Sequence, residues 1–245
     1  MVEYLRYQSD GFKRYEDYAA EGFKRNDIIA KMVVKTDKVR GVNHALELKF
    51  GYAGENSDET YVGLSADDFK KTPFLRYAGS QMDKLKTDHQ QWGATYLLTF
   101  SNKLKVTTNA YYNYFHRNWY KLNDVRAGIT SKEKISVADV LIDPETHIRY
   151  FDIQTGKTDR EGEAFLVRAN NRTYRSRGIQ TRAEYRFNVK EFFFDLEFGL
   201  RYHADEEDRF QWDDSYSMKN KKMVLFMEGI HGTNANRVTS ANALA

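Results

Sequence analysis

The chain has 245 residues, of which 38 are Lys or Arg and 35 are Asp or Glu, so its formal charge is +3. This balance is too even for a DNA-binding surface, and the lack of cysteine excludes disulfide scaffolds and thiolate metal sites. No apolar run approaches the roughly 20 residues of a membrane-spanning helix, and Met1–Tyr4 leads into polar residues without a secretory signal. The 17 Tyr, 16 Phe and 3 Trp are typical of β-structure and of transmembrane barrels.

Apolar and polar residues alternate over seven segments, and a period of two predicts β-strands. In chain order the predicted strands are residues 2–8, 27–35, 42–52, 90–100, 104–114, 177–187 and 192–202. Alternation is cleanest in the last segment, where the apolar face carries Phe192, Phe194, Leu196, Phe198, Leu200 and Tyr202. The clear strands have about 11 residues, more than the usual 5–6 and close to the 9–11 of a bilayer-crossing strand.

Short and long connections alternate between these strands. The short ones are Asp37–Gly41, Ser101–Lys103 and Asn188–Glu191, and the long ones are 9–26, 53–89, 116–176 and 203 to the end. This pattern predicts an antiparallel up-and-down meander with every short turn at one end, as in barrels with short periplasmic turns and long extracellular loops.

Two of the long connections contain capping boxes. Ser65 and Ser136 are each followed three residues later by an aspartate, which predicts short helices that Pro73 and Pro144 would end.

The two faces of the predicted strands differ in chemistry. One face is apolar and aromatic, and the other is charged, with Glu47, Lys49, Lys105, Arg182, Glu184, Arg186, Asp195, Glu197 and Arg201. A closed barrel would turn the first to lipid and the second to its lumen. A soluble antiparallel sheet with one wet face alternates in the same way. Strand length, loop asymmetry and the aromatic content favour the transmembrane barrel.

Three segments resemble TonB-dependent outer-membrane receptors, with the ferric-dicitrate (FecA-type) siderophore receptors as the most similar subgroup. They are Phe115–Leu122, Asn170–Gln180, and Glu59–Leu64 together with Arg76–Gln81. The resemblance covers nearly the whole chain in order. It implies a Gram-negative outer-membrane location, import of a ferric chelate, energy supplied by the TonB complex through a plug domain, and contact with outer-membrane lipid and lipopolysaccharide.

The chain departs from this family in several ways. The family has a barrel of about 22 strands around a plug, whereas seven strands are predicted here, with no plug and no TonB-contact motif. We therefore expect residues 1–245 to be a partial β-barrel domain, an internal fragment whose Met1 is an internal methionine or a truncated start. The final residues, Asn242–Ala245, suggest the beginning of another strand.

The candidate site is a group of cations with one aromatic residue in the predicted loop 116–176 and at its strand ends. Guanidinium groups bind carboxylates bidentately, and an aromatic ring can stack on a ligand, so a ferric-citrate or other anionic siderophore complex would fit. The predicted ligand-binding residues are Arg117, Trp119, Lys121, Arg168, Arg172 and Arg175. The alternative is that the arginines face lipopolysaccharide or water.

Other site chemistry has little support. No catalytic motif is present, no two histidines have metal-ligand spacing, and no cofactor is predicted. Asp205–Asp208 could attract a divalent cation but is more typical of a solvated loop tip. We expect a receptor and not an enzyme, with no nucleic-acid partner. The alternative functions are a soluble β-sheet ligand- or carbohydrate-binding module and an outer-membrane enzyme.

Overall fold

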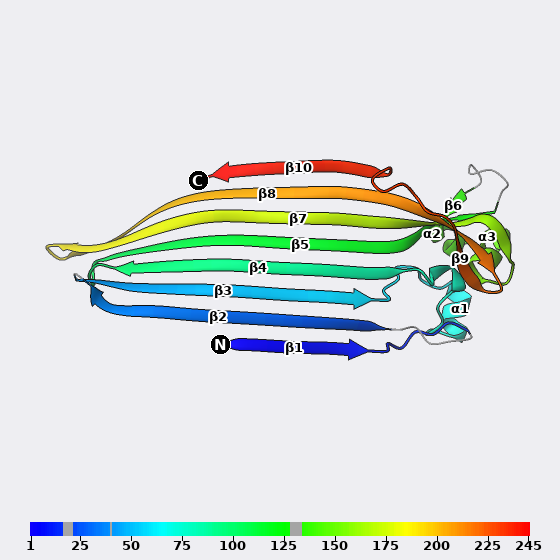
Figure 1. Cartoon of the computed structure of the whole chain (residues 1–245), viewed down its shortest axis with the longest axis horizontal. Helices are drawn as coiled ribbons and strands as arrows, with labels where there is room; N and C mark the ends of the chain where they lie inside the picture. Colours follow the sequence, from blue (N-terminus) through cyan, green and yellow to red (C-terminus); the bar gives the residue numbers. More distant parts are fainter. Residues whose placement is uncertain (17–21, 40, 128–133) are drawn as a thin grey trace.

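Strands dominate the computed structural model of the chain, which describes residues 1–16, 22–39, 41–127 and 134–245. Its single antiparallel sheet has ten strands in the order β1-β2-β3-β4-β5-β7-β8-β10, with β6 on β5 and β9 on β8 (Figure 1). The long strands are β1 (Val2–Ser9), β2 (Phe23–Val39), β3 (Val42–Ser57), β4 (Lys84–Thr99), β5 (Leu104–Arg126), β7 (Arg160–Val189), β8 (Phe192–Lys219) and β10 (Ala235–Leu244). The sheet is open, with β1 and β10 at its edges.

The predicted meander is confirmed. All seven predicted strands are present, and the predicted short turns Ser101–Lys103 and Asn188–Glu191 lie together at one end of the sheet, on the left in Figure 1. The paired residues Val39 and Val42, at the ends of β2 and β3, lie at the same end, whereas residue 40 of the predicted turn Asp37–Gly41 is outside the described residues. A further tight turn, Asn220–Lys221, joins β8 to β9 (Lys222–Met227) at the opposite end. Both of its residues have positive φ, 49° and 61°, as a type I′ hairpin turn requires.

The strands are much longer than their alternating segments, so the predicted loop boundaries are wrong. β5 continues to Arg126 and β7 begins at Arg160, which places nearly half of the predicted loop 116–176 in strands. β3 continues to Ser57 and β8 to Lys219. Apolar alternation stops where both faces become polar, but backbone pairing does not need an apolar face and continues.

The register confirms that the two predicted faces are continuous across the sheet. Residues directly opposite each other on neighbouring strands lie on the same face. One cross-strand row consists of Leu46, Tyr96, Thr108, Thr181 and Leu200, and the adjacent row of Glu47, Thr95, Asn109, Gln180 and Arg201. We call the face of the first row the apolar face and that of the second the polar face. All nine predicted lumen residues lie on the polar face.

The buried core lies at the other end of the sheet, where the long connections form a cap (Figure 1). Its elements are α1 (Ala66–Lys71), η1 (Ala78–Ser80), β6 (Lys134–Ser136), α2 (Val137–Ile142), α3 (Ile148–Thr155) and β9. Leu122, Phe165 and Met218 of the long strands are fully buried against them. The tertiary packing of described side chains is therefore concentrated beside the long connections.

Both predicted capping boxes are confirmed. The Ser65 hydroxyl accepts a hydrogen bond from the Asp68 amide at 3.3 Å, and Ser136 accepts one from Asp139 at 3.2 Å. Both helices end two residues before the predicted prolines. α3 was not predicted; it ends at Thr155 and is followed by Gly156, whose φ of 80° suits a residue without a Cβ. Across the described residues, we find no helix with the length and apolarity needed to cross a bilayer.

Candidate functional site

The predicted ligand-binding residues lie on two paired strands and not in a loop. Arg117, Trp119 and Lys121 belong to β5, and the three remaining arginines belong to β7. The register places Arg117 opposite Arg172 and Lys121 opposite Arg168. The structure thus brings these four cations together through the backbone ladder, which holds side chains more rigidly than a loop would.

Arg175 is separated from the other five residues. It lies three positions after Arg172, and an odd separation along a strand places it on the apolar face. Its guanidinium group pairs with Glu206 and lies 5.9 Å from the ring centroid of Tyr114. Arg175 is therefore not part of the cluster on the polar face, contrary to the sequence-based prediction.

Lys121 is enclosed by two aromatic rings. Its Nζ lies 4.0 Å from the ring centroid of Tyr61 and 4.8 Å from that of Trp119. The two rings meet edge to face at 6.0 Å. Cation–π contacts of this kind hold an ammonium group without neutralising it. Among the described residues, the buried Trp119 Nε1 has no acceptor.

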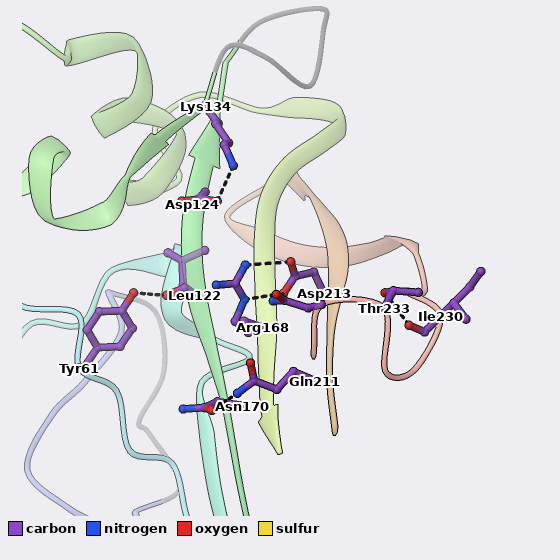
Figure 2. A network of polar contacts seen from close by, with 11 residues as sticks. Tyr61, Leu122, Asp124, Lys134, Arg168, Asn170, Gln211, Asp213, Ile230 and Thr233 are labelled. Carbon is purple, nitrogen blue, oxygen red and sulfur yellow. Dashed lines mark hydrogen bonds and ion pairs between the residues drawn. The ribbon is translucent and has the colours of Figure 1, made fainter. Parts of the chain in front are cut away.

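Arg168 is already engaged by a carboxylate. Its Nε and Nη2 donate to the two oxygens of Asp213 at 2.8 and 3.0 Å, a bidentate pair between β7 and β8 (Figure 2). Asn170 accepts a hydrogen bond from Gln211 in the next polar-face row. An incoming anion would have to displace or share Asp213, so Arg168 is a poorer candidate for ligand binding than Lys121.

Asp83 ties the long connection between β3 and β4 to this site. Its Oδ1 accepts a hydrogen bond from the Leu122 amide at 2.6 Å, and its Oδ2 accepts one from the Thr60 hydroxyl at 2.5 Å. Burial raises the pKa of Asp83 to about 6, although these hydrogen bonds and the nearby Arg76 oppose the shift. The neighbouring Tyr61 hydroxyl donates to the Leu122 carbonyl (Figure 2). Asp83 thereby positions the ring that covers Lys121.

The polar face also carries cations that the sequence analysis missed. Arg209 of β8 lies opposite Arg172, and Arg237 of β10 lies opposite Arg209. Together with Arg117 they form a row of four arginines on four adjacent strands, which we call the arginine row. Like charges directly opposite each other are destabilising. Such a row is therefore expected where a function requires positive charge.

Little within the described part of the chain neutralises the arginine row. Arg172 donates to Glu207 at 3.2 Å, to Asn170 at 3.1 Å and to the Tyr174 hydroxyl. For the other three arginines, the described residues provide no ion pair, and the buried Nε of Arg209 has no acceptor there. Only the register could reveal this row, because its members are dozens of residues apart in sequence.

The acidic run Asp205–Asp208 is not a loop tip. It lies within β8, so Asp205 and Glu207 are on the polar face while Glu206 and Asp208 are on the apolar face. Because successive carboxylates point to opposite sides, they cannot converge on one cation. No group of three or more potential metal ligands occurs among the residues that the structure describes.

Comparison with known proteins identifies no relative: no protein-family model matches the chain, and no curated protein does so. The chemistry of the site must therefore be read from its residues. Guanidinium groups that have no ion pair among the described residues, together with an aromatic-caged lysine, are suited to binding an anion that offers several carboxylate or phosphate oxygens.

Proposed function

We propose that this sheet forms part of the wall of an outer-membrane β-barrel. The observation that supports the proposal is the exposed apolar face. Side chains such as Trp92, Phe198 and Leu200 are at least half exposed, at 52%, 72% and 55%. Contiguous apolar surface of this size on a soluble protein is unusual and marks contact with a partner or with lipid. The soluble-module alternative would leave this surface in water.

The distribution of aromatic residues on the apolar face fits a bilayer. Near the short turns, the ring centroids of Tyr185, Phe187 and Phe194 follow one another at 5.5 and 5.1 Å. Toward the cap, the apolar face carries a second group of exposed aromatic residues that includes Trp92 and Tyr202. From Phe194 to Tyr202 is eight residues, or roughly 27 Å of strand. A tilt of about 35–45° reduces this to about 20 Å of membrane normal, near the apolar band of about 25 Å in known barrels.

An open sheet of this kind is not stable in lipid by itself. The outer edges of β1 and β10 carry unpaired backbone groups, which a bilayer core cannot satisfy. We therefore propose that further strands pair with both edges to close the barrel. The polar face would then line the lumen, and the cap would lie outside the cell.

Within this barrel we propose the function that the resembling segments imply, a TonB-dependent receptor that imports an anionic ferric chelate, with ferric citrate as the first candidate. Phe115–Leu122 and Asn170–Gln180 run along β5 and β7, so their polar-face side chains would border the lumen below the cap. Lys121, Arg117 and Arg172 would hold the chelate. Energy would come from TonB through a plug, because a barrel wall has no energy source of its own.

Two arginines on opposite faces of β7 test this proposal. Arg172 and Arg175 each pair with a glutamate of β8, Glu207 and Glu206 respectively. Ferric-citrate binding to whole cells at fixed salt should weaken about 10- to 100-fold in Arg172→Ala, because the substitution removes one charge-assisted hydrogen bond to the ligand. Arg175→Ala should bind like the parent. Equal effects of the two substitutions would contradict a ligand held on the polar face.

A further inference from the structure

A second part of the polar face has a different character from the aromatic-caged lysine. A hollow of about 400 Å³ lies over β5, β7, β8 and β10, and its lining includes Phe115, Tyr174, Asp205 and Glu207. The rings of Phe115 and Tyr174 are stacked, with centroids 6.0 Å apart and planes inclined by 22°. The hollow therefore combines a flat apolar surface with two carboxylates.

The hollow runs beside the arginine row. The register aligns Phe115, Tyr174, Glu207 and Thr239 in one cross-strand row. Each of these residues lies two positions from an arginine of the arginine row on the same strand, so the two rows are parallel and roughly 7 Å apart. A ligand extended across the strands would touch aromatic rings along one side and guanidinium groups along the other.

We propose that these two rows bind an acidic oligosaccharide, such as a short oligouronide, lying across β5, β7, β8 and β10. Its carboxylates would engage the arginine row, and the C–H faces of its sugar rings would lie on Phe115 and Tyr174. Its hydroxyl groups would donate to Asp205 and Glu207.

Spacing supports an extended ligand. Neighbouring strands are about 4.8 Å apart, so four arginines span roughly 14 Å. A pyranose linked through its ring positions advances a chain by a distance similar to one strand spacing. Successive uronic acids can therefore place their carboxylates near successive arginines, whereas a compact anion would reach only part of the row.

Charge distinguishes this ligand from two other classes. A neutral sugar would leave unmatched the three arginines that have no ion pair within the described ranges. A polyphosphate or nucleic acid also carries one charge on every repeat but has few free hydroxyl groups to donate to Asp205 and Glu207, so these two carboxylates would only repel it. An acidic sugar matches both sets of protein groups. Its hydroxyl groups can donate to the carboxylates of the protein, and its own carboxylates can accept from the guanidinium groups.

The proposed sugar site goes beyond the ferric-chelate function: the two sites share Arg117 and Arg172 but differ in their other residues. Arg209, Arg237 and Tyr174 are specific to the sugar site. Lys121, enclosed by Tyr61 and Trp119, lies four residues along β5 from Arg117 and belongs to the chelate site alone.

The test measures binding of trigalacturonate to the detergent-solubilised protein by calorimetry. Arg209→Gln and Arg237→Gln should each weaken binding about tenfold or more, since each removes a charge-assisted contact. Arg237 is exposed on an edge strand, so its loss does not disturb the core. Arg201→Gln is the matched control, because Arg201 lies on the polar face of β8 but outside both rows.

Three further measurements decide the outcome. The uncharged galactose trimer should bind at least about tenfold more weakly than trigalacturonate. Tyr174→Ala should weaken trigalacturonate binding, and Lys121→Gln should weaken ferric-citrate binding while leaving trigalacturonate unchanged. The proposal is overturned if the parent protein does not bind trigalacturonate, if Arg237→Gln binds it like the parent, or if the neutral trimer binds equally well. Equal loss of both ligands in Lys121→Gln would show a single shared site and refute a separate sugar site.

Discussion

An arginine introduced in the middle of the apolar face of β8 should destabilise the membrane-inserted protein far more than one introduced at the adjacent position. Phe198 lies four residues from Phe194 and four from Tyr202, so roughly 13 Å of strand separates it from either aromatic group. Arginine near the bilayer midplane costs about 2–4 kcal/mol. Loss of the contact between the phenylalanine side chain and lipid adds about 1.5–3 kcal/mol. We expect Phe198→Arg to cost about 3.5–7 kcal/mol.

The neighbouring substitution Glu197→Arg changes the polar face at nearly the same depth. Glu197 lies 3.7 Å from Arg182, and its side chain is 60% exposed. An exposed ion pair of this kind contributes at most about 1 kcal/mol, so Glu197→Arg should cost about that amount, with some added repulsion from Arg182. The two adjacent positions should thus differ by roughly 3 kcal/mol or more.

The assay is urea unfolding of the protein inserted in phospholipid vesicles, followed by tryptophan fluorescence. With a urea dependence of about 1–3 kcal/mol per molar, a difference of 3 kcal/mol separates the two midpoints by about 1 M or more. Equal midpoints would refute the assignment of the apolar face to lipid. A soluble module gives a different result, because Phe198→Arg would then replace a water-exposed phenylalanine with little loss of stability.

The remaining predictions concern topology and pH. Cysteines placed at Asn102 and Lys157 in intact cells should differ in reaction with a membrane-impermeant maleimide: position 157 in the cap should label and position 102 in a short turn should not, and the reverse would invert the proposed topology. Asp83→Asn should flatten the pH dependence of cap stability, because the folded pKa of about 6 lies above the unfolded value of about 3.9. Stability from this group is therefore fully present below about pH 4 and falls by about 3 kcal/mol as the pH rises through 6. Hydrogen exchange of the Leu122 amide, corrected for intrinsic rates, would measure this change in the stability of the cap with pH. If the stability of Asp83→Asn depended on pH as that of the parent does, Asp83 would not be its cause.

Several features of this protein are decided by local sequence. The side-chain period of two follows from the extended backbone itself, so the alternation in 192–202 was enough to predict both the strand and its two faces. Ser65 and Ser136 cap helices whose first turns lie beside them in the chain. The short turns could be located because they interrupt otherwise regular alternation. Each of these depends on residues only a few positions apart, so the sequence contains all the information required.

Other features arise only from pairing between distant strands. The polar continuations of β5 and β7 show no alternation, and they are strands because each satisfies the backbone of its neighbour. The expected clustering of Arg175 with Arg172 does not occur for this reason: in a loop the two could converge, but on a strand their odd separation places Arg175 on the opposite face.

The arginine row shows this dependence most directly. Arg209 and Arg237 resemble any other surface arginines in the sequence, and only the register of four neighbouring strands aligns them with Arg117 and Arg172. Register is set by the whole ladder and its turns. A one-residue slip would move a strand's arginine to the other face and remove it from the row. The composition of the site is therefore a property of tertiary pairing, whereas the chemistry of each face is a property of the sequence.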